Sequence, residues 1–146
     1  WIVEAMFTVV SGGAAAEPDF NIGVANGTNA TDFDSVTERL SLHIDGNSTN
    51  LNLGSTDGTT TVAYTDTTTD YTAGSTVAVR EHWLFDGRDP ADIQVYRNGA
   101  LMLGSTVFKL DAATGPLFLI AHFEKTSSAT VFELDLERLR VWYSEQ

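Results

Sequence analysis

The chain of 146 residues contains no cysteine, three prolines and few basic residues. Without cysteine, neither a disulfide framework nor a thiolate nucleophile or metal site is available, so packing and hydrogen bonds must stabilise the fold. No apolar run approaches the roughly 20 residues that a membrane-spanning helix needs. A hydrophobic content of 42% is enough for one independent core, and we predict a single domain over residues 1–146.

Positive charge is scarce. Eight lysines and arginines stand against 20 acidic residues, which gives a formal net charge of −12. A surface of this sign repels phosphate backbones and anionic lipid headgroups, so we expect neither nucleic acid nor a membrane as a partner. The same charge keeps a β-rich protein soluble and discourages pairing between sheet edges.

A β-hairpin is predicted over Ile93–Met102. Its turn, Asn98-Gly99, accepts a positive φ at both central positions, so the type I′ turn that matches the twist of the flanking strands forms without strain. Elsewhere no long helical period occurs, and Ser35 with Glu38 resembles a capping box that suffices for one helical turn at most. These features predict an all-β domain.

Apolar and polar residues alternate in several segments, as in strands that cover a core with one face. In the first segment five residues share a face: Trp1, Val3, Ala5, Phe7 and Val9. Residues 39–45 alternate likewise, and a turn at Asp45-Gly46-Asn47 leads to further apolar positions, which predicts a second hairpin. The Thr-rich residues 55–76 favour extended backbone, so we expect short edge strands there.

Three segments depart from simple alternation. Glu81 interrupts the apolar face of residues 77–85. Residues 116–123 are apolar on both faces, which predicts burial on both sides, within the domain or against a neighbouring subunit. In the last strand the apolar residues change phase, and an extra residue near Glu137-Arg138 would restore a single core face. We therefore predict a β-bulge at this point.

The C-terminal half resembles a known family. A Trp-bearing strand with Trp83 leads to the hairpin at residues 93–101, then to the apolar strand at residues 117–123 and to a closing strand that reads Glu-Arg-Leu-Arg-Val at residues 137–141. This order resembles the second half of a concanavalin-A-like, laminin-G-like sandwich. The resemblance implies a two-sheet antiparallel β-sandwich of the jelly-roll type.

Chains of this size and fold, with Thr/Ala/Gly-rich loops and no cysteine, are similar to bacteriophage virion proteins, especially capsid decoration proteins. The resemblance implies a non-enzymatic structural protein on the capsid surface, assembled in the host cytoplasm. Its partners would be the major capsid protein lattice and further copies of the chain, arranged as a trimer. We expect contacts through the loops Ser11–Pro18 and Asn26–Asp34.

Four apolar or aromatic side chains are candidates for contact. Tyr96 and Trp142 fall opposite the core phase and are expected to be exposed, and Phe118 with Ile120 forms the second apolar face of its strand. We predict that they contact a protein partner, because Tyr and Trp are enriched at interfaces. Alternatively, exposed rings stack on sugars, and the competing hypothesis is a carbohydrate-binding, lectin-like module for phage adsorption or at a cell surface.

An enzymatic alternative depends on Glu133, Asp135 and Glu137, which alternate in a pattern that resembles the catalytic strand of family 16 glucanases. In those enzymes the motif lies mid-chain, whereas only nine residues follow Glu137 here. The other interpretation is the solvated face of a closing strand, partly neutralised by Arg138 and Arg140. We prefer this interpretation and predict no catalytic site.

No metal or cofactor is expected. The three histidines, His43, His82 and His122, fall on separate predicted strands without ligand-like spacing. Residues 45–50 alternate oxygen-bearing side chains as a calcium loop does, but they lack the terminal bidentate Glu. A hairpin turn rich in Asp and Asn explains that segment better.

Overall fold

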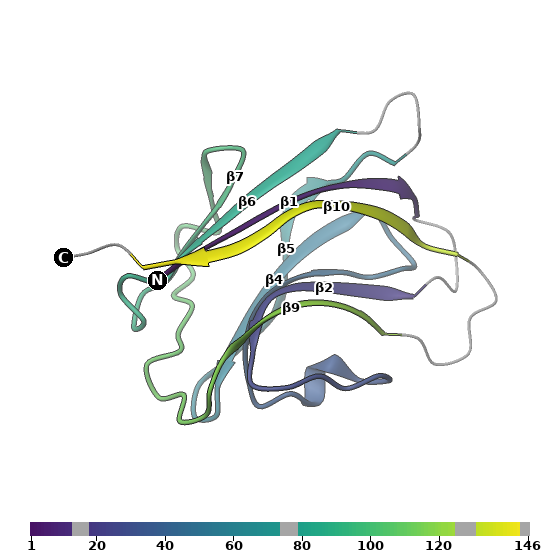
Figure 1. Ribbon diagram of the computed structural model, residues 1–146. Helices are drawn as coiled ribbons and strands as arrows, with labels where there is room; N and C mark the ends of the chain where they lie inside the picture. Colours follow the sequence, from purple (N-terminus) through teal and green to yellow (C-terminus); the bar gives the residue numbers. More distant parts are fainter. Residues whose placement is uncertain (13–17, 74–78, 125–130, 144–146) are drawn as a thin grey trace.

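Two antiparallel sheets pack face to face in this chain (Figure 1). The computed structural model describes residues 1–12, 18–73, 79–124 and 131–143. The first sheet has the order β10-β1-β6-β7-β8 and the second the order β5-β4-β3-β2-β9. This arrangement confirms the predicted all-β sandwich and is consistent with a jelly roll. In the described part of the chain, no helix is long and apolar enough to cross a membrane.

The first sheet is made of β1 (Ile2–Ser11), β6 (Arg80–Asp86), β7 (Gln94–Arg97), β8 (Ala100–Met102) and β10 (Glu133–Trp142). The second sheet is made of β2 (Asp19–Ala25), β3 (Glu38–Ile44), β4 (Asn50–Asp57), β5 (Thr61–Asp70) and β9 (Phe118–Glu124). A single 3-10 turn, η1 (Phe33–Ser35), lies between β2 and β3.

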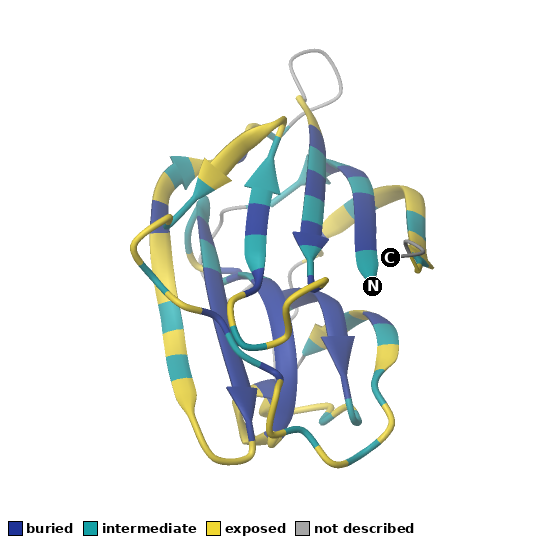
Figure 2. Cartoon of the chain, turned by 90° about the vertical axis from the view of Figure 1, so that its left-hand side faces the viewer, coloured by how far each residue is buried: buried dark blue, intermediate teal, exposed yellow. Residues whose placement is uncertain are grey.

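The core lies between the inner faces of the two sheets. The alternating apolar residues of β1, from Val3 to Val9, are fully buried, as the period of two predicts. Phe7 of β1 meets Phe20 of β2 edge to face, with ring centroids 6.0 Å apart. Trp83 is also fully buried. In Figure 2 the buried class is concentrated in the central strands, whereas the edges and loops are largely exposed.

Both predicted hairpins are present. Asn98 and Gly99 have φ values of 50° and 83°, which confirms positive φ at both central positions of the turn between β7 and β8. Strands β3 and β4 form the second hairpin, in which the Asp45 side chain accepts a hydrogen bond from the Asn47 backbone N–H at 2.8 Å. Local turn chemistry therefore sets the register of both hairpins.

The β-bulge in the last strand is confirmed. Met6 pairs with Arg138 and Phe7 pairs with Leu136, so Glu137 is the extra residue on β10. The bulge keeps Leu136 on the same face as the apolar residues beyond it, although their alternation changes phase in the sequence.

Two local expectations were wrong in detail. The Thr-rich region forms one ten-residue edge strand, β5, and not several short ones. The helical turn spans Phe33–Ser35 and ends where the capping-box pattern would begin a helix. Glu38 instead opens β3, where its carboxylate accepts hydrogen bonds from the backbone N–H groups of Thr114 and Gly115 at 2.8 and 3.0 Å. These long-range contacts override the local pattern.

Glu81, the charged residue within an apolar face, is fully buried and paired. Its two carboxylate oxygens accept hydrogen bonds from Nε and Nη2 of Arg97, both at 2.7 Å. Nη2 also donates to the carbonyl oxygen of Asp70 in the second sheet at 2.9 Å. The pair therefore connects β6 and β7 to β5 at one end of the core, and its hydrogen bonds offset the cost of burying two charges.

We expect Arg97→Met to destabilise the fold by about 3–5 kcal/mol, because it leaves the Glu81 carboxylate buried without its partner. The double substitution Glu81→Leu with Arg97→Met should recover most of this loss, since it removes both charges together. Urea unfolding of the two variants measures the difference. A double variant less stable than Arg97→Met alone would contradict this account of the pair.

Candidate functional site

Exposed apolar side chains concentrate on one side of the sandwich. Strands β9 and β10 are edge strands of different sheets, and both lie on this side (Figure 1). Nine large hydrophobic side chains of the described residues are strongly exposed, and six of them lie on or directly beside these two strands: Phe118, Phe123, Val131, Leu136, Val141 and Tyr143. We call this the open side. Such a concentration is typical of interaction surfaces.

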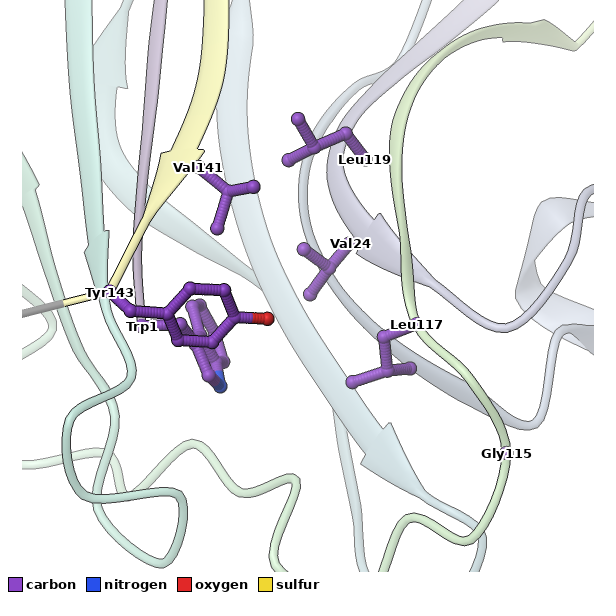
Figure 3. Close-up of a pocket in the computed structure, with 7 residues that line it drawn as sticks. All are labelled: Trp1, Val24, Gly115, Leu117, Leu119, Val141 and Tyr143. Carbon is purple, nitrogen blue, oxygen red and sulfur yellow. The ribbon is translucent and has the colours of Figure 1, made fainter.

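A cleft of about 250 Å³ lies on the open side, between the edges of the two sheets (Figure 3). It is lined by Trp1, Val24, Gly115, Leu117, Leu119, Val141 and Tyr143. The hydroxyl group of Tyr143 points toward the cleft, and among the described residues no charged side chain lines it. The volume is below the roughly 300–1,000 Å³ of a typical small-molecule site. The cleft therefore suits one apolar side chain of a protein partner better than a free ligand.

The structure separates the two predicted contact residues of β9. Phe118 is 57% exposed and lies on the open side. Ile120 is only 6% exposed, because it packs with Ala25, Phe33 and Val36 in a second apolar cluster. Burial within the domain is therefore confirmed at Ile120, whereas burial of Phe118 would need a neighbouring subunit and stays a prediction. Ile120 is not accessible to a partner.

The other two predicted residues, Tyr96 and Trp142, are partly buried on the outer face of the first sheet. Trp142 pairs with Ile2, and Tyr96 pairs with Leu84 three strands away from β10. At the usual strand spacing this places them at least about 14 Å apart. The guanidinium of Arg140 lies 4.9 Å from the centroid of the Trp142 ring. The two rings therefore belong to one sheet face but do not form one site.

Of the two loops expected to contact a partner, only the loop Asn26–Asp34 lies wholly within the described residues. Residues 13–17, most of the loop Ser11–Pro18, lie outside the described residues. In the loop Asn26–Asp34, Phe33 is fully buried against the second sheet, so part of this loop belongs to the fold. The remaining polar residues of this loop keep the predicted contact role.

Glu4 is the centre of a charged network on the outer face of the first sheet. It is buried and accepts hydrogen bonds from His82, Arg138 and Arg140 at 2.9, 3.3 and 2.5 Å. Burial opposes ionisation of Glu4, but the bonds from Arg140, His82 and Arg138 outweigh it and lower the pKa of the carboxyl group. The network ties β1 to both of its neighbours.

The three carboxylates of the enzymatic alternative lie along the outer face of β10. Glu133, Asp135 and Glu137 are all exposed, and Glu137 forms an ion pair with Arg80 at 2.7 Å. They follow one another along a single edge strand. Their exposure agrees with the interpretation as a solvated acidic face. The absence of a catalytic site stays a prediction.

A polar network that sequence reasoning missed lies on the outer face of the second sheet. Asn21 is fully buried, and its Oδ1 accepts a hydrogen bond from the Tyr64 hydroxyl at 3.1 Å. The same oxygen lies 2.9 Å from Nδ1 of His43. Because an amide oxygen only accepts, Nδ1 of His43 is the donor in this hydrogen bond. The Asn21 amide nitrogen donates to Glu124 at 3.5 Å.

Tyr64 reaches this network because Gly54 has no side chain. A Cβ at Gly54 would lie 2.7 Å from the Tyr64 ring. The ring stacks on His43, with centroids 4.4 Å apart and planes at 21°. Burial raises the pKa of the Tyr64 phenol, against an opposing hydrogen bond with Ser41. The result is a fixed aromatic pair on an otherwise polar sheet face.

Strand register explains why these residues meet. One row across the second sheet contains His122, Asn21, His43, Asn52 and Asp66. The fold therefore places two of the histidines on either side of Asn21, whereas His82 lies on the other sheet. Among the described residues, no three potential ligand side chains are arranged to hold a metal ion.

His122 lies at the border of the second apolar cluster. Its ring stacks on Phe33 with centroids 5.4 Å apart, and its Nδ1 is buried without a hydrogen-bond partner in the described structure. Burial lowers the pKa of His122. The neighbouring Glu124 shifts in the opposite direction, since burial raises its pKa against an opposing bond from the Phe33 backbone N–H. Burial therefore shifts the pKa of each group in the direction of its neutral form.

Stability should therefore fall at acid pH because of His122. Since its pKa in the folded state is below the ordinary value of 6.5, the unfolded chain takes up the proton first, and stability is lost as the pH falls below that value. We expect His122→Phe, which keeps the ring stack, to reduce the loss between pH 7.5 and 5.5 in urea unfolding. Glu124 is present in both proteins and cancels in the comparison. An equal loss in both proteins would contradict the assignment.

Comparisons of the chain with protein-family models, with curated proteins and with solved structures gave no match.

Proposed function

We propose that this chain is a non-enzymatic docking module of a larger protein assembly, and that the assembly is a bacteriophage capsid. The observation that carries the docking role is the apolar cleft on the open side, together with the exposed side chains around it. The capsid as partner is supported by the resemblance to jelly-roll decoration proteins, which is an analogy of fold and composition.

The cleft supplies the anchoring contact in this proposal. A protein interface gains most of its free energy from a few apolar or aromatic side chains that enter well-packed pockets, and the surrounding contacts exclude water. Trp1 and Tyr143 provide aromatic area at the cleft, and Leu117 with Leu119 provides the apolar wall opposite. Many such modules on one lattice add modest contacts through multivalency.

The charges of the domain indicate the character of the partner surface. All six arginines form ion pairs with carboxylates within the chain, at distances of 2.5–3.6 Å. With a formal net charge of −12, the surface is therefore dominated by unpaired acidic groups. A partner surface that is uncharged or basic around the anchoring side chain best complements the acidic surface of this domain.

The docking role is tested with Val141→Glu, which places a charge in the cleft. We expect the substitution to weaken binding to purified capsids that lack this protein by about tenfold or more, because a buried unpaired carboxylate is costly. Val107→Glu is the matched control, since Val107 and Val141 are similarly exposed, at 46% and 41%. Copies bound per particle are counted by quantitative mass spectrometry. Equal binding of both variants would contradict docking through the cleft.

Carbohydrate binding is the second candidate, and the stacked pair of His43 and Tyr64 favours it. An aromatic surface beside the side chains of Asn52 and Asp66 offers stacking and hydrogen bonds to a sugar. In this proposal the candidate sugar site lies on the second sheet, and sugar binding at Tyr96 or Trp142 stays a separate prediction.

If this second candidate is correct, the chain binds defined sugars on a glycan array, and His43→Ala abolishes the signal. His82→Ala, the same change on the other sheet, should leave it intact. An array without reproducible binding, or equal loss in both variants, would argue against a sugar site at His43.

A further inference from the structure

Among the described residues, the two sheets end in four strands that pair on one side only: β8 and β10 in the first sheet, β5 and β9 in the second. An edge strand presents unpaired backbone N–H and C=O groups, which form a template for pairing with another chain. Proteins usually block such pairing with very short strands, bulges or charged side chains. The four edges of this domain differ sharply in this respect.

Three edges carry such features. Strand β8 has only three residues. Strand β10 contains the bulge at Glu137 and carries five charged side chains along its length. Strand β5 has two interruptions in its register with β4, and Thr68 in the strand has a φ of 62°. These irregularities make each of the three edges a poor template for a further strand.

Strand β9 is neither very short nor bulged, and its only acidic residue lies at its end. Its seven residues pair with β2 in an uninterrupted register, and the strand contains no Lys, Arg or Pro. Glu124 at the end of the strand is its one acidic residue. Phe118 is 57% exposed, Phe123 is 43% exposed, and Ala121 between them is also exposed. A regular, largely apolar edge of this kind is expected to be covered when the protein functions.

We propose that β9 pairs antiparallel with β9 of a second copy of this chain, about a twofold axis at Ala121, in place of the trimer that the resemblance implies. The two second sheets would then join into one continuous sheet. Leu119 lies opposite Phe123 of the partner subunit in this register, and Ala121 lies opposite Ala121 of the partner subunit. A twofold interface requires that one patch complement itself, and this strand does so.

The order of side chains suits a second copy. On the inner face the pairs formed by Leu119 and Phe123 extend the apolar layer of each sandwich, and the small Ala121 allows close approach at the axis. Each Glu124 lies opposite Phe118 of the partner subunit. The two Glu124 positions are therefore about 20 Å apart along the strands, which exceeds the screening length of about 8–10 Å at physiological salt. No like charges oppose each other within the strand pair.

The overall charge of each copy opposes association at long range. With a formal net charge of −12 per chain, the two copies repel each other, and added salt screens this repulsion. The pairing should therefore become tighter as the ionic strength rises. This inference does not depend on a capsid as partner, because it uses the backbone edge of β9 and the isolated chain.

Sedimentation equilibrium of the isolated chain tests the proposal. We expect a monomer–dimer equilibrium, and Ala121→Lys should raise the dissociation constant about fivefold or more, because it places like charges directly opposite each other. Ala63→Lys is the matched control, since Ala63 is equally exposed on β5, at the other edge of the same sheet. A chain that stays monomeric, forms a trimer, or responds equally to both substitutions would overturn the proposal.

A second variant tests the axis directly. The chain contains no cysteine, so Ala121→Cys introduces a single thiol at the proposed axis. Directly opposed residues in an antiparallel pair have Cβ atoms about 4.5–5.5 Å apart, close enough for a disulfide after a small adjustment. Mild oxidation should give a cross-linked dimer with Ala121→Cys and little with Ala63→Cys. Equal cross-linking of the two would reject the axis, whereas docking to capsids would remain open to its own test.

Discussion

The structure depends on one constraint, which is that each sheet must bury a single face against the other. Strand β1 satisfies it with an unbroken alternation from Val3 to Val9, and the contact between Phe7 and Phe20 joins the two layers at the centre. The bulge at Glu137 serves the same constraint, because without the extra residue the second half of β10 would turn its apolar side chains to solvent. The bulge in β10 is therefore a consequence of the alternation of buried and exposed side chains along the strand.

The buried charged and amide side chains near the core are paired, whereas Nε1 of Trp83 and Nδ1 of His122 are buried without a hydrogen-bond partner in the described structure. Glu81 accepts two hydrogen bonds from Arg97 between the two sheets. On the outer face of the first sheet, Glu4 accepts hydrogen bonds from His82, Arg138 and Arg140. On the second sheet, the side chain of Asn21 forms hydrogen bonds with Tyr64, His43 and Glu124. These networks rigidify both outer faces. A rigid scaffold is what a module needs if it is to hold a binding surface without reorganising.

The open side follows from how the sandwich ends. Strands β9 and β10 belong to different sheets and do not pair with each other, so the apolar layer between them stays partly uncovered. The cleft beside Trp1 and Tyr143 and the free edge of β9 are two aspects of this one feature. One offers a pocket for a side chain and the other offers backbone groups for a strand. Both support a domain that acts by contact with other proteins.

Features that depend on neighbouring residues in the chain could be predicted. The type I′ turn follows from Asn98-Gly99 alone, and the bulge follows from a change of phase within ten residues of one strand. The exposure of Phe118 and the burial of Ile120 could not be predicted, because both depend on which strand forms the edge and on where the η1 turn packs. The row that joins His122, Asn21 and His43 likewise needs the strand order.

The amino-acid sequence by itself determined the class of this protein: apolar alternation and turn residues act over a few bonds, and they require antiparallel strands with one buried face. Only the tertiary structure decided which surfaces remain for function. Sheet order and the choice of edges are set by contacts between residues far apart in the chain, and those contacts leave no local pattern. The cleft, the edge of β9 and the network around Asn21 all depend on such contacts between residues far apart in the chain.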